Sequence, residues 1–135
     1  MIKKITTILT AAIVMAGIGG ATKASAKDFG MSLAPSQTWR YLTDAPDCAD
    51  TKDGTGSTGY ISLNEICEAK SYYVYAKAVN YYGQDRAYET TVAQYEQNHT
   101  IYEHDMVRYY TYYLALKNTT WTSGYVWTSG QFGWY

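Results

Sequence analysis

The 135-residue sequence has little proline, little glycine and few basic residues. Two prolines and 11 glycines are too few for a collagen or a linker protein. After residue 26, no apolar run approaches the length that is needed to span a bilayer. The same part of the chain carries eight basic and twelve acidic residues, a formal charge of −4 that repels a phosphate backbone. We therefore predict no nucleic acid partner and no stable membrane insertion after cleavage.

Aromatic residues, in contrast, are abundant. All 16 tyrosines, four tryptophans and two phenylalanines follow residue 26, a composition that excludes a disordered tail. The 109 residues from 27 to 135 are enough for one domain at most.

Residues 1–26 have the three parts of a secretory signal peptide. Lys3 and Lys4 form the charged start, an apolar stretch follows, and Ala24 and Ala26 frame a small-residue cleavage site. A retained membrane anchor is the alternative, but threonines and glycines interrupt the apolar stretch. The leader resembles those of Gram-positive bacteria, so we predict a secreted protein, extracellular or associated with the cell wall.

Cys48 and Cys67 are the only cysteines. Outside the cell an oxidising environment permits a disulfide between them. Such a bridge closes a loop with 18 residues between the cysteines and contributes about 3 kcal/mol in the chain-entropy model. A reactive thiol or a metal pair is the alternative, without C-x-x-C spacing or a nearby histidine to support it. We predict a structural disulfide.

Alternating side chains indicate β-strands. In residues 71–79 the odd positions include two tyrosines and a lysine, and the even positions are Tyr, Val, Ala and Ala. Residues 109–117 show the same period, with Leu114 and Leu116 on the apolar side. Residues 88–95 and 99–102 are rich in Thr, Val, Ile and Tyr, which suit a pleated surface.

Weaker strand candidates are residues 39–42 and 60–63, whereas residues 62–65 have the spacing of a helix capping box, which leaves one helical turn open. Six or seven short strands near ten residues apart indicate an antiparallel sandwich or barrel. No segment offers the crossover helices of a parallel sheet. We predict an all-β, antiparallel β-sandwich, immunoglobulin-like or Greek key, after a cleaved N-terminal signal helix.

Tyrosine occurs on both sides of the predicted strands at 71–79 and 109–117, although a two-layer core buries only one side. Some of these rings must therefore face outward. A flat, partly polar ring suits a sugar, a peptide or another subunit. The structural alternative is that tyrosines stack across strands and stabilise the sheet.

A short repeat supplies candidate contact residues, because Trp-Thr-Ser-Gly occurs at 121–124 and again at 127–130. In one continuous strand Trp121 and Trp127 lie on the same face, about 20 Å apart. Glycines that form bulges or turns would break this register. We predict that Trp121, Tyr125, Trp127 and Trp134 contact a partner such as cell-wall glycan or another protein.

Four carboxylates follow at three-residue intervals, at Asp44, Asp47, Asp50 and Asp53. Calcium requires converging oxygens, but this spacing differs from that of an EF-hand loop and Lys52 lies among the candidates. We interpret the segment as a solvated turn region and predict no metal site.

Catalytic motifs are weak as well. His99 and His104 are five residues apart, which suits neither a zinc helix nor one face of a strand. A general base needs an orienting partner and a nucleophile, and no serine has a nucleophile-elbow signature. No pair of carboxylates is marked for glycoside hydrolysis. We predict that the protein is not an enzyme and has no cofactor.

Residues 72–80 (YYVYAKAVN), 113–118 (YLALKN) and 129–132 (SGQF) resemble the closing half of a group of small secreted Firmicute proteins of unknown function. This resemblance implies a β-sandwich outside the cell and no catalytic residues. A more distant resemblance is to lactococcin 972-like bacteriocins, from which the cysteine pair and the acidic charge depart. We expect a non-catalytic binding or surface-interaction module that uses exposed aromatics, with a bacteriocin-like antimicrobial protein as the alternative.

Overall fold

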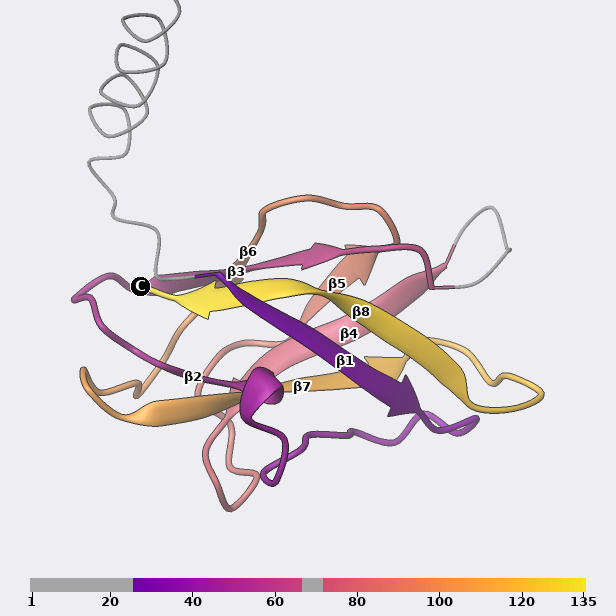
Figure 1. Ribbon diagram of the computed structural model, residues 1–135, viewed down its shortest axis with the longest axis horizontal. Coiled ribbons are helices and arrows are strands. Elements are labelled where there is room, and N and C mark those ends of the chain that lie inside the picture. Colours follow the sequence, from indigo (N-terminus) through magenta and orange to yellow (C-terminus); the bar gives the residue numbers. More distant parts are fainter. Residues whose placement is uncertain (1–25, 67–71) are drawn as a thin grey trace, which may run out of the picture.

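A computed structural model describes residues 26–66 and 72–135 as a two-layered β-structure (Figure 1). The predicted signal peptide lies outside the described residues, Ala24 included, except for the exposed Ala26. The described elements are β1 (Lys27–Leu33), the short 3₁₀ helix η1 (Pro46–Cys48), β2 (Ala49–Thr51), β3 (Thr58–Leu63), β4 (Tyr73–Val79), β5 (Thr90–Ala93), β6 (His99–Tyr102), β7 (Thr111–Asn118) and β8 (Val126–Trp134).

The eight strands form two four-stranded sheets. Sheet A has the order β1-β8-β3-β6 and sheet B the order β2-β7-β4-β5. All pairs of neighbouring strands are antiparallel. This order is that of a jelly roll, in which eight strands form two Greek keys. The predicted antiparallel sandwich is confirmed, and of the two expected topologies the Greek key is the one found.

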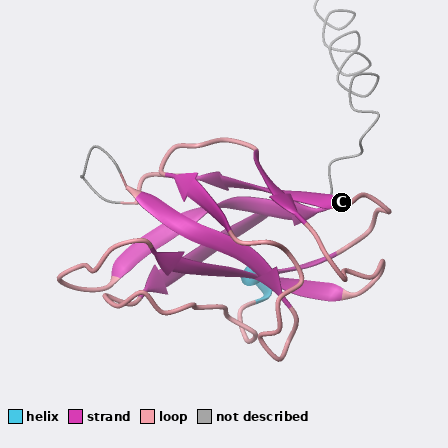
Figure 2. Cartoon of the chain, turned by 180° about the vertical axis from the view of Figure 1, so that it is seen from behind, coloured by secondary structure: helices cyan, strands magenta, loops and turns pink. Residues whose placement is uncertain are grey.

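The strand order also divides the loops between the two ends of the sandwich. The β2–β3, β4–β5 and β6–β7 loops lie with the end of β8 at one end, which we call the pocket end. The β3–β4, β5–β6 and β7–β8 connections lie at the opposite end. Seen from behind, strands make up most of the fold and η1 is the single helical turn among the described residues (Figure 2).

The core forms from the inward-facing positions of both sheets. In β4 the even positions Val74, Ala76 and Ala78 are fully buried, as the alternation predicts. Tyr72 is 8% exposed and its neighbour Tyr73 is 46% exposed, so tyrosines do lie on both sides of this segment. Each large apolar side chain that is buried in this way contributes about 1.5–3 kcal/mol.

Several strand boundaries differ from the prediction. Residues 99–102 form β6 as expected, but β7 begins at Thr111 because Tyr109 has a left-handed φ of 72° that belongs to a turn. Residues 39–42 form no strand, and only Arg40 makes an isolated bridge, to Leu116. The sequence did not indicate β1 or the three-residue β2.

The possible capping box at residues 62–65 does not start a helix, since residues 62–66 contain no helical turn. Ser62 and Leu63 belong to β3, and the Ser62 hydroxyl accepts a hydrogen bond from the Asn98 N–H at 2.8 Å instead of capping a helical turn. Residues 67–71, where such a turn would continue, lie outside the described residues.

In the described part of the chain no helix has the length and hydropathy of a membrane span.

Candidate binding surfaces

Three of the predicted contact residues, Trp121, Tyr125 and Trp127, are exposed, and we call them together the Trp surface. Their side chains are 74%, 68% and 59% exposed, respectively. Trp121 and Tyr125 lie in the β7–β8 loop, and Trp127 is the second residue of β8. The two tryptophans therefore do not share one continuous strand, and the interruption between them is the alternative that the sequence left open.

Trp127 lies on the outer face of sheet A. It is paired with Ser32 of β1, and Gly30 lies two residues before Ser32 on β1. A Cβ atom on Gly30 would be 2.5 Å from the Trp127 ring, so the indole covers the bare backbone of this glycine. Trp127 thus combines an exposed ring face with a packed one.

Trp134 is a core residue, so the prediction that it contacts a partner is wrong. Its side chain is fully buried, its ring lies 5.4 Å from that of Phe132, and its Nε1–H donates to the Tyr112 carbonyl at 3.4 Å. The reason is strand periodicity: Trp127 and Trp134 are seven positions apart in β8, and an odd step places them on opposite faces.

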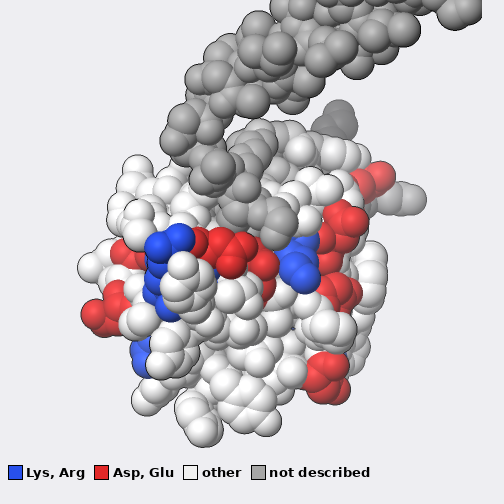
Figure 3. All heavy atoms as spheres, turned by 60° about the vertical axis from the view of Figure 1, so that its left-hand side comes forward, with Lys and Arg blue, Asp and Glu red and all other residues white. Residues whose placement is uncertain are grey.

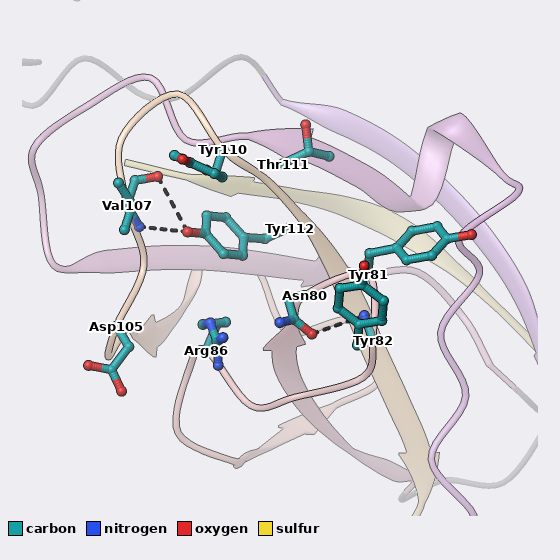
Figure 4. Close-up of a pocket in the computed structure, with 9 residues that line it drawn as sticks. All are labelled: Asn80, Tyr81, Tyr82, Arg86, Asp105, Val107, Tyr110, Thr111 and Tyr112. Atoms are coloured by element: carbon teal, nitrogen blue, oxygen red, sulfur yellow. Dashed lines mark hydrogen bonds between the residues drawn. The ribbon is translucent and has the colours of Figure 1, made fainter.

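A pocket with a volume of about 480 Å³ lies at the pocket end, between the β4–β5 and β6–β7 loops. Figure 4 shows Tyr81 and Tyr82 on one side of it and Val107 and Tyr110 on the other, with Arg86 between them. Its lining residues are Asn80, Tyr81, Tyr82, Arg86, Asp105, Val107, Tyr110, Thr111 and Tyr112.

Asn80 organises the β4–β5 loop. Its Oδ1 accepts the N–H groups of Tyr82 and Gln84 at 3.0 and 2.9 Å, the pattern of an Asx turn. Gly83 completes the turn with a φ of 77°, and a Cβ atom there would be 2.5 Å from the Tyr41 hydroxyl. The turn therefore requires glycine and is supported from the β1–β2 loop.

Tyr112 anchors the opposite wall of the pocket. Its side chain is buried, and its hydroxyl accepts the Val107 N–H at 2.6 Å (Figure 4). The backbone of Lys52 adds two hydrogen bonds, accepting from Tyr109 at 2.7 Å and donating to the Tyr110 carbonyl at 3.0 Å. The β6–β7 loop is thus held from β7 and from the end of β2.

A buried ion pair lies at the start of the β6–β7 loop. Lys52 Nζ contacts Glu103 Oε2, with both side chains 4% exposed, and also donates to the Gly56 carbonyl at 2.5 Å and to the Tyr135 carbonyl. Burial raises the pKa of Glu103, and the Lys52 ammonium opposes this rise. Because one side chain joins three chain segments, the geometry of this end depends on Lys52.

Charge at the pocket end is mixed. When this end faces the viewer, acidic and basic side chains form a short band beside a broad uncharged area (Figure 3). Within the pocket, Arg86 and Asp105 supply one charge of each sign. The Arg86 guanidinium donates to the Asp85 carbonyl at 2.8 Å, so it is oriented by its own loop. A pocket of this kind combines ring faces with a few donors and acceptors.

The four aspartates do not gather into one site. Asp44, Asp47 and Asp53 are exposed, whereas Asp50 is buried in β2. Burial raises the pKa of Asp50, although its Oδ1 accepts the Thr51 N–H at 3.0 Å. No group of three His, Cys, Asp or Glu side chains is placed to hold a metal ion within residues 26–66 and 72–135.

Cys48 is a buried free thiol at the end of η1, with its Sγ 3.7 Å from the Gly30 carbonyl. Burial raises its thiol pKa to about 11. Cys67, its predicted partner, lies outside the described residues. The disulfide therefore stays a prediction.

Comparison of the chain with protein-family models, curated proteins and solved structures finds no match. The resemblance to secreted Firmicute proteins stays a prediction. Fold and pocket together define a jelly-roll β-sandwich with a tyrosine-lined pocket between two braced loops.

Proposed function

We propose that this protein is a secreted binding module that holds a saccharide of the cell wall in the pocket. The observation that carries the proposal is the pocket itself, where the exposed rings of Tyr81, Tyr82 and Tyr110 meet Arg86 and Asp105. Secretion is part of the proposal and rests on the predicted signal peptide.

The chemistry of the lining supports a sugar. The apolar faces of a pyranose ring pack on aromatic rings, which provide contact area at low entropic cost. Its hydroxyl groups need donors and acceptors close by, and the guanidinium, carboxylate and phenol groups of the pocket supply both. The volume of about 480 Å³ lies in the range of small-molecule sites.

The braced loops support binding because an ordered site loses less entropy when a ligand arrives. Asn80 and Gly83 fix one wall, and Tyr112 and Lys52 fix the other, before any ligand is present. Tyr81 is further held edge-on against Tyr82 and Tyr113, with ring centroids 5.5 and 6.2 Å apart.

Binding to purified cell walls and to soluble wall fragments tests the proposal. Tyr81→Ala and Arg86→Ala should each reduce retention at least tenfold, because each removes a direct contact. Tyr102→Ala is the matched control, since Tyr102 is comparably exposed but lies on β6, outside the pocket and the Trp surface. Unchanged retention of both pocket variants would reject the pocket as the site.

A further inference from the structure

Thr90 and His99 meet in the seam between the two sheets. Thr90 begins β5, the edge strand of sheet B, and His99 begins β6, the edge strand of sheet A. Each lies two positions before a fully buried residue, Val92 or Ile101, so both side chains point toward the interior. The His99 side chain keeps 21% of its surface exposed, so the seam is open to solvent at this point.

Both ring nitrogens of His99 have a partner. Nε2 lies 2.7 Å from the Thr90 hydroxyl, and Nδ1 lies 2.7 Å from Glu96 Oε1. A hydroxyl on one imidazole nitrogen and a carboxylate on the other is the arrangement by which a histidine activates a nucleophile. The sequence predicted no enzyme because no serine has a nucleophile motif, whereas this hydroxyl belongs to a threonine within a strand.

Glu96 is held in place by the backbone. Its Oε2 accepts the Ala93 N–H at 3.0 Å, while Oε1 faces the histidine. Burial by itself would raise the pKa of Glu96, but the hydrogen bonds from Ala93 and His99 outweigh it and lower the pKa. The carboxylate is therefore ionised at neutral pH and favours the tautomer with a proton on Nδ1, which leaves Nε2 as the base.

The backbone of β5 offers a donor beside the hydroxyl. Hydrogen bonds alternate along an antiparallel edge strand. The Gln94 N–H donates to the Tyr72 carbonyl of the β4 segment, and the Ala93 N–H points the other way, to Glu96. The same alternation directs the Thr91 N–H away from β4, next to Thr90. The N–H that follows a nucleophile is a common oxyanion donor.

We propose that Thr90, His99 and Glu96 form an acyl-transfer site that hydrolyses small carboxylic esters, an activity beyond the binding function. Thr90 and His99 are the catalytic residues, Glu96 is a positioning residue, and the Thr91 N–H stabilises the oxyanion.

In the first half of the reaction, Thr90 Oγ1 forms a bond to the ester carbonyl carbon while its proton passes to His99 Nε2. The carbonyl π electrons move to the oxygen, which faces the Thr91 N–H. When the carbonyl re-forms, the bond to the alcohol oxygen breaks and this oxygen takes the proton from Nε2. In the second half, water repeats these steps on the acyl-threonine, releases the carboxylic acid and restores Thr90.

A fluorophosphonate probe and p-nitrophenyl acetate test the proposal on the purified protein. The probe forms an O–P bond with an activated hydroxyl and releases fluoride, so mass spectrometry should find the adduct on Thr90. Thr90→Val and His99→Gln should each lower p-nitrophenol release about 100-fold, because general acid–base catalysis contributes a factor of this order. Thr90→Ser should retain the activity.

Thr100→Val is the matched control, because it removes an exposed hydroxyl from the residue next to His99 and leaves the proposed site unchanged. Circular dichroism and the melting temperature of each variant establish that it is folded. The proposal is overturned if folded wild-type protein gives no adduct on Thr90 and releases p-nitrophenol no faster than Thr90→Val. It is also overturned if an adduct on Thr90 forms equally well in His99→Gln.

Discussion

The pocket and the Trp surface both expose aromatic rings, but different forces hold them. In the pocket, side chains such as Asn80 and Tyr112 bond to loop backbone, and Lys52 joins three segments behind one wall. On the Trp surface, the outward-facing ring of Trp127 packs on Gly30, and Trp121 is 74% exposed. The shape of the pocket therefore depends on polar side chains that bond to its loops, whereas on the Trp surface Trp127 lies on the outer face of sheet A and Trp121 and Tyr125 lie in the β7–β8 loop.

This difference teaches that ring exposure is a poor guide to a site. Isolated exposed apolar side chains are normal on protein surfaces. A concave group of rings that depends on buried charges and loop hydrogen bonds carries a cost in stability, and such a cost is typical of functional regions.

Lys52→Met should have the largest effect. It leaves the buried Glu103 without its cation, and breaking a buried pair from one side costs about 3–5 kcal/mol of unfolding free energy. Urea denaturation measures the loss, and saccharide binding should fall with it. A loss below about 1 kcal/mol, with binding intact, would show that the pair does not support the pocket.

The pH dependence of this variant sharpens the prediction. The pKa of Glu103 is already raised by burial, and removal of the ammonium raises it further. A group whose pKa is higher in the folded state contributes stability below its unfolded pKa and loses it as pH rises. The deficit of Lys52→Met should therefore be largest at neutral pH, shrink as pH falls through the raised pKa of Glu103, and be smallest at about pH 4, where the carboxyl group is largely protonated. A deficit that stays constant with pH would contradict this assignment.

Tyr112→Phe should have an intermediate effect. It removes the hydroxyl that accepts the Val107 N–H and costs about 1–1.5 kcal/mol of stability. Because this wall of the pocket is loosened, saccharide affinity measured by calorimetry should fall severalfold. Tyr113→Phe is the control, since it keeps the ring that packs against Tyr81 and removes only a hydroxyl on the outer face of β7. Equal saccharide affinities of the two variants would show that the Tyr112 hydroxyl does not support the pocket.

Periodicity in the sequence predicted much of the sandwich but little of the pocket. The alternation along β4 and β7 reports which side is buried. The odd step from Trp127 to Trp134 was a signal that our prediction of Trp134 as a contact residue overlooked. The Asn80 turn also has a local signal, an asparagine followed by a glycine at position 83.

The rest depends on contacts between distant segments. The pocket exists because the jelly-roll order brings the β4–β5 and β6–β7 loops to one end, which no local pattern specifies. Likewise, Thr90 and His99 meet only because their two strands form the facing edges of different sheets. Lys52 and Glu103 could not be paired from sequence, since each is an ordinary surface residue by type.

Trp127→Ala should have the smallest effect, within about 1 kcal/mol, because its ring is largely exposed and no hydrogen bond is lost. The informative measurement is a double-mutant cycle with Gly30→Ala. In the wild type the new methyl group meets the indole at 2.5 Å, so Gly30→Ala alone should be destabilising. When Trp127 is also replaced by alanine, the methyl group at position 30 has space. Alanine is more stable than glycine within a strand, so the double variant should be more stable than Gly30→Ala alone. If the changes in unfolding free energy of the two single variants add up to that of the double variant, the indole does not pack on Gly30. Trp127 would then be a freely exposed ring.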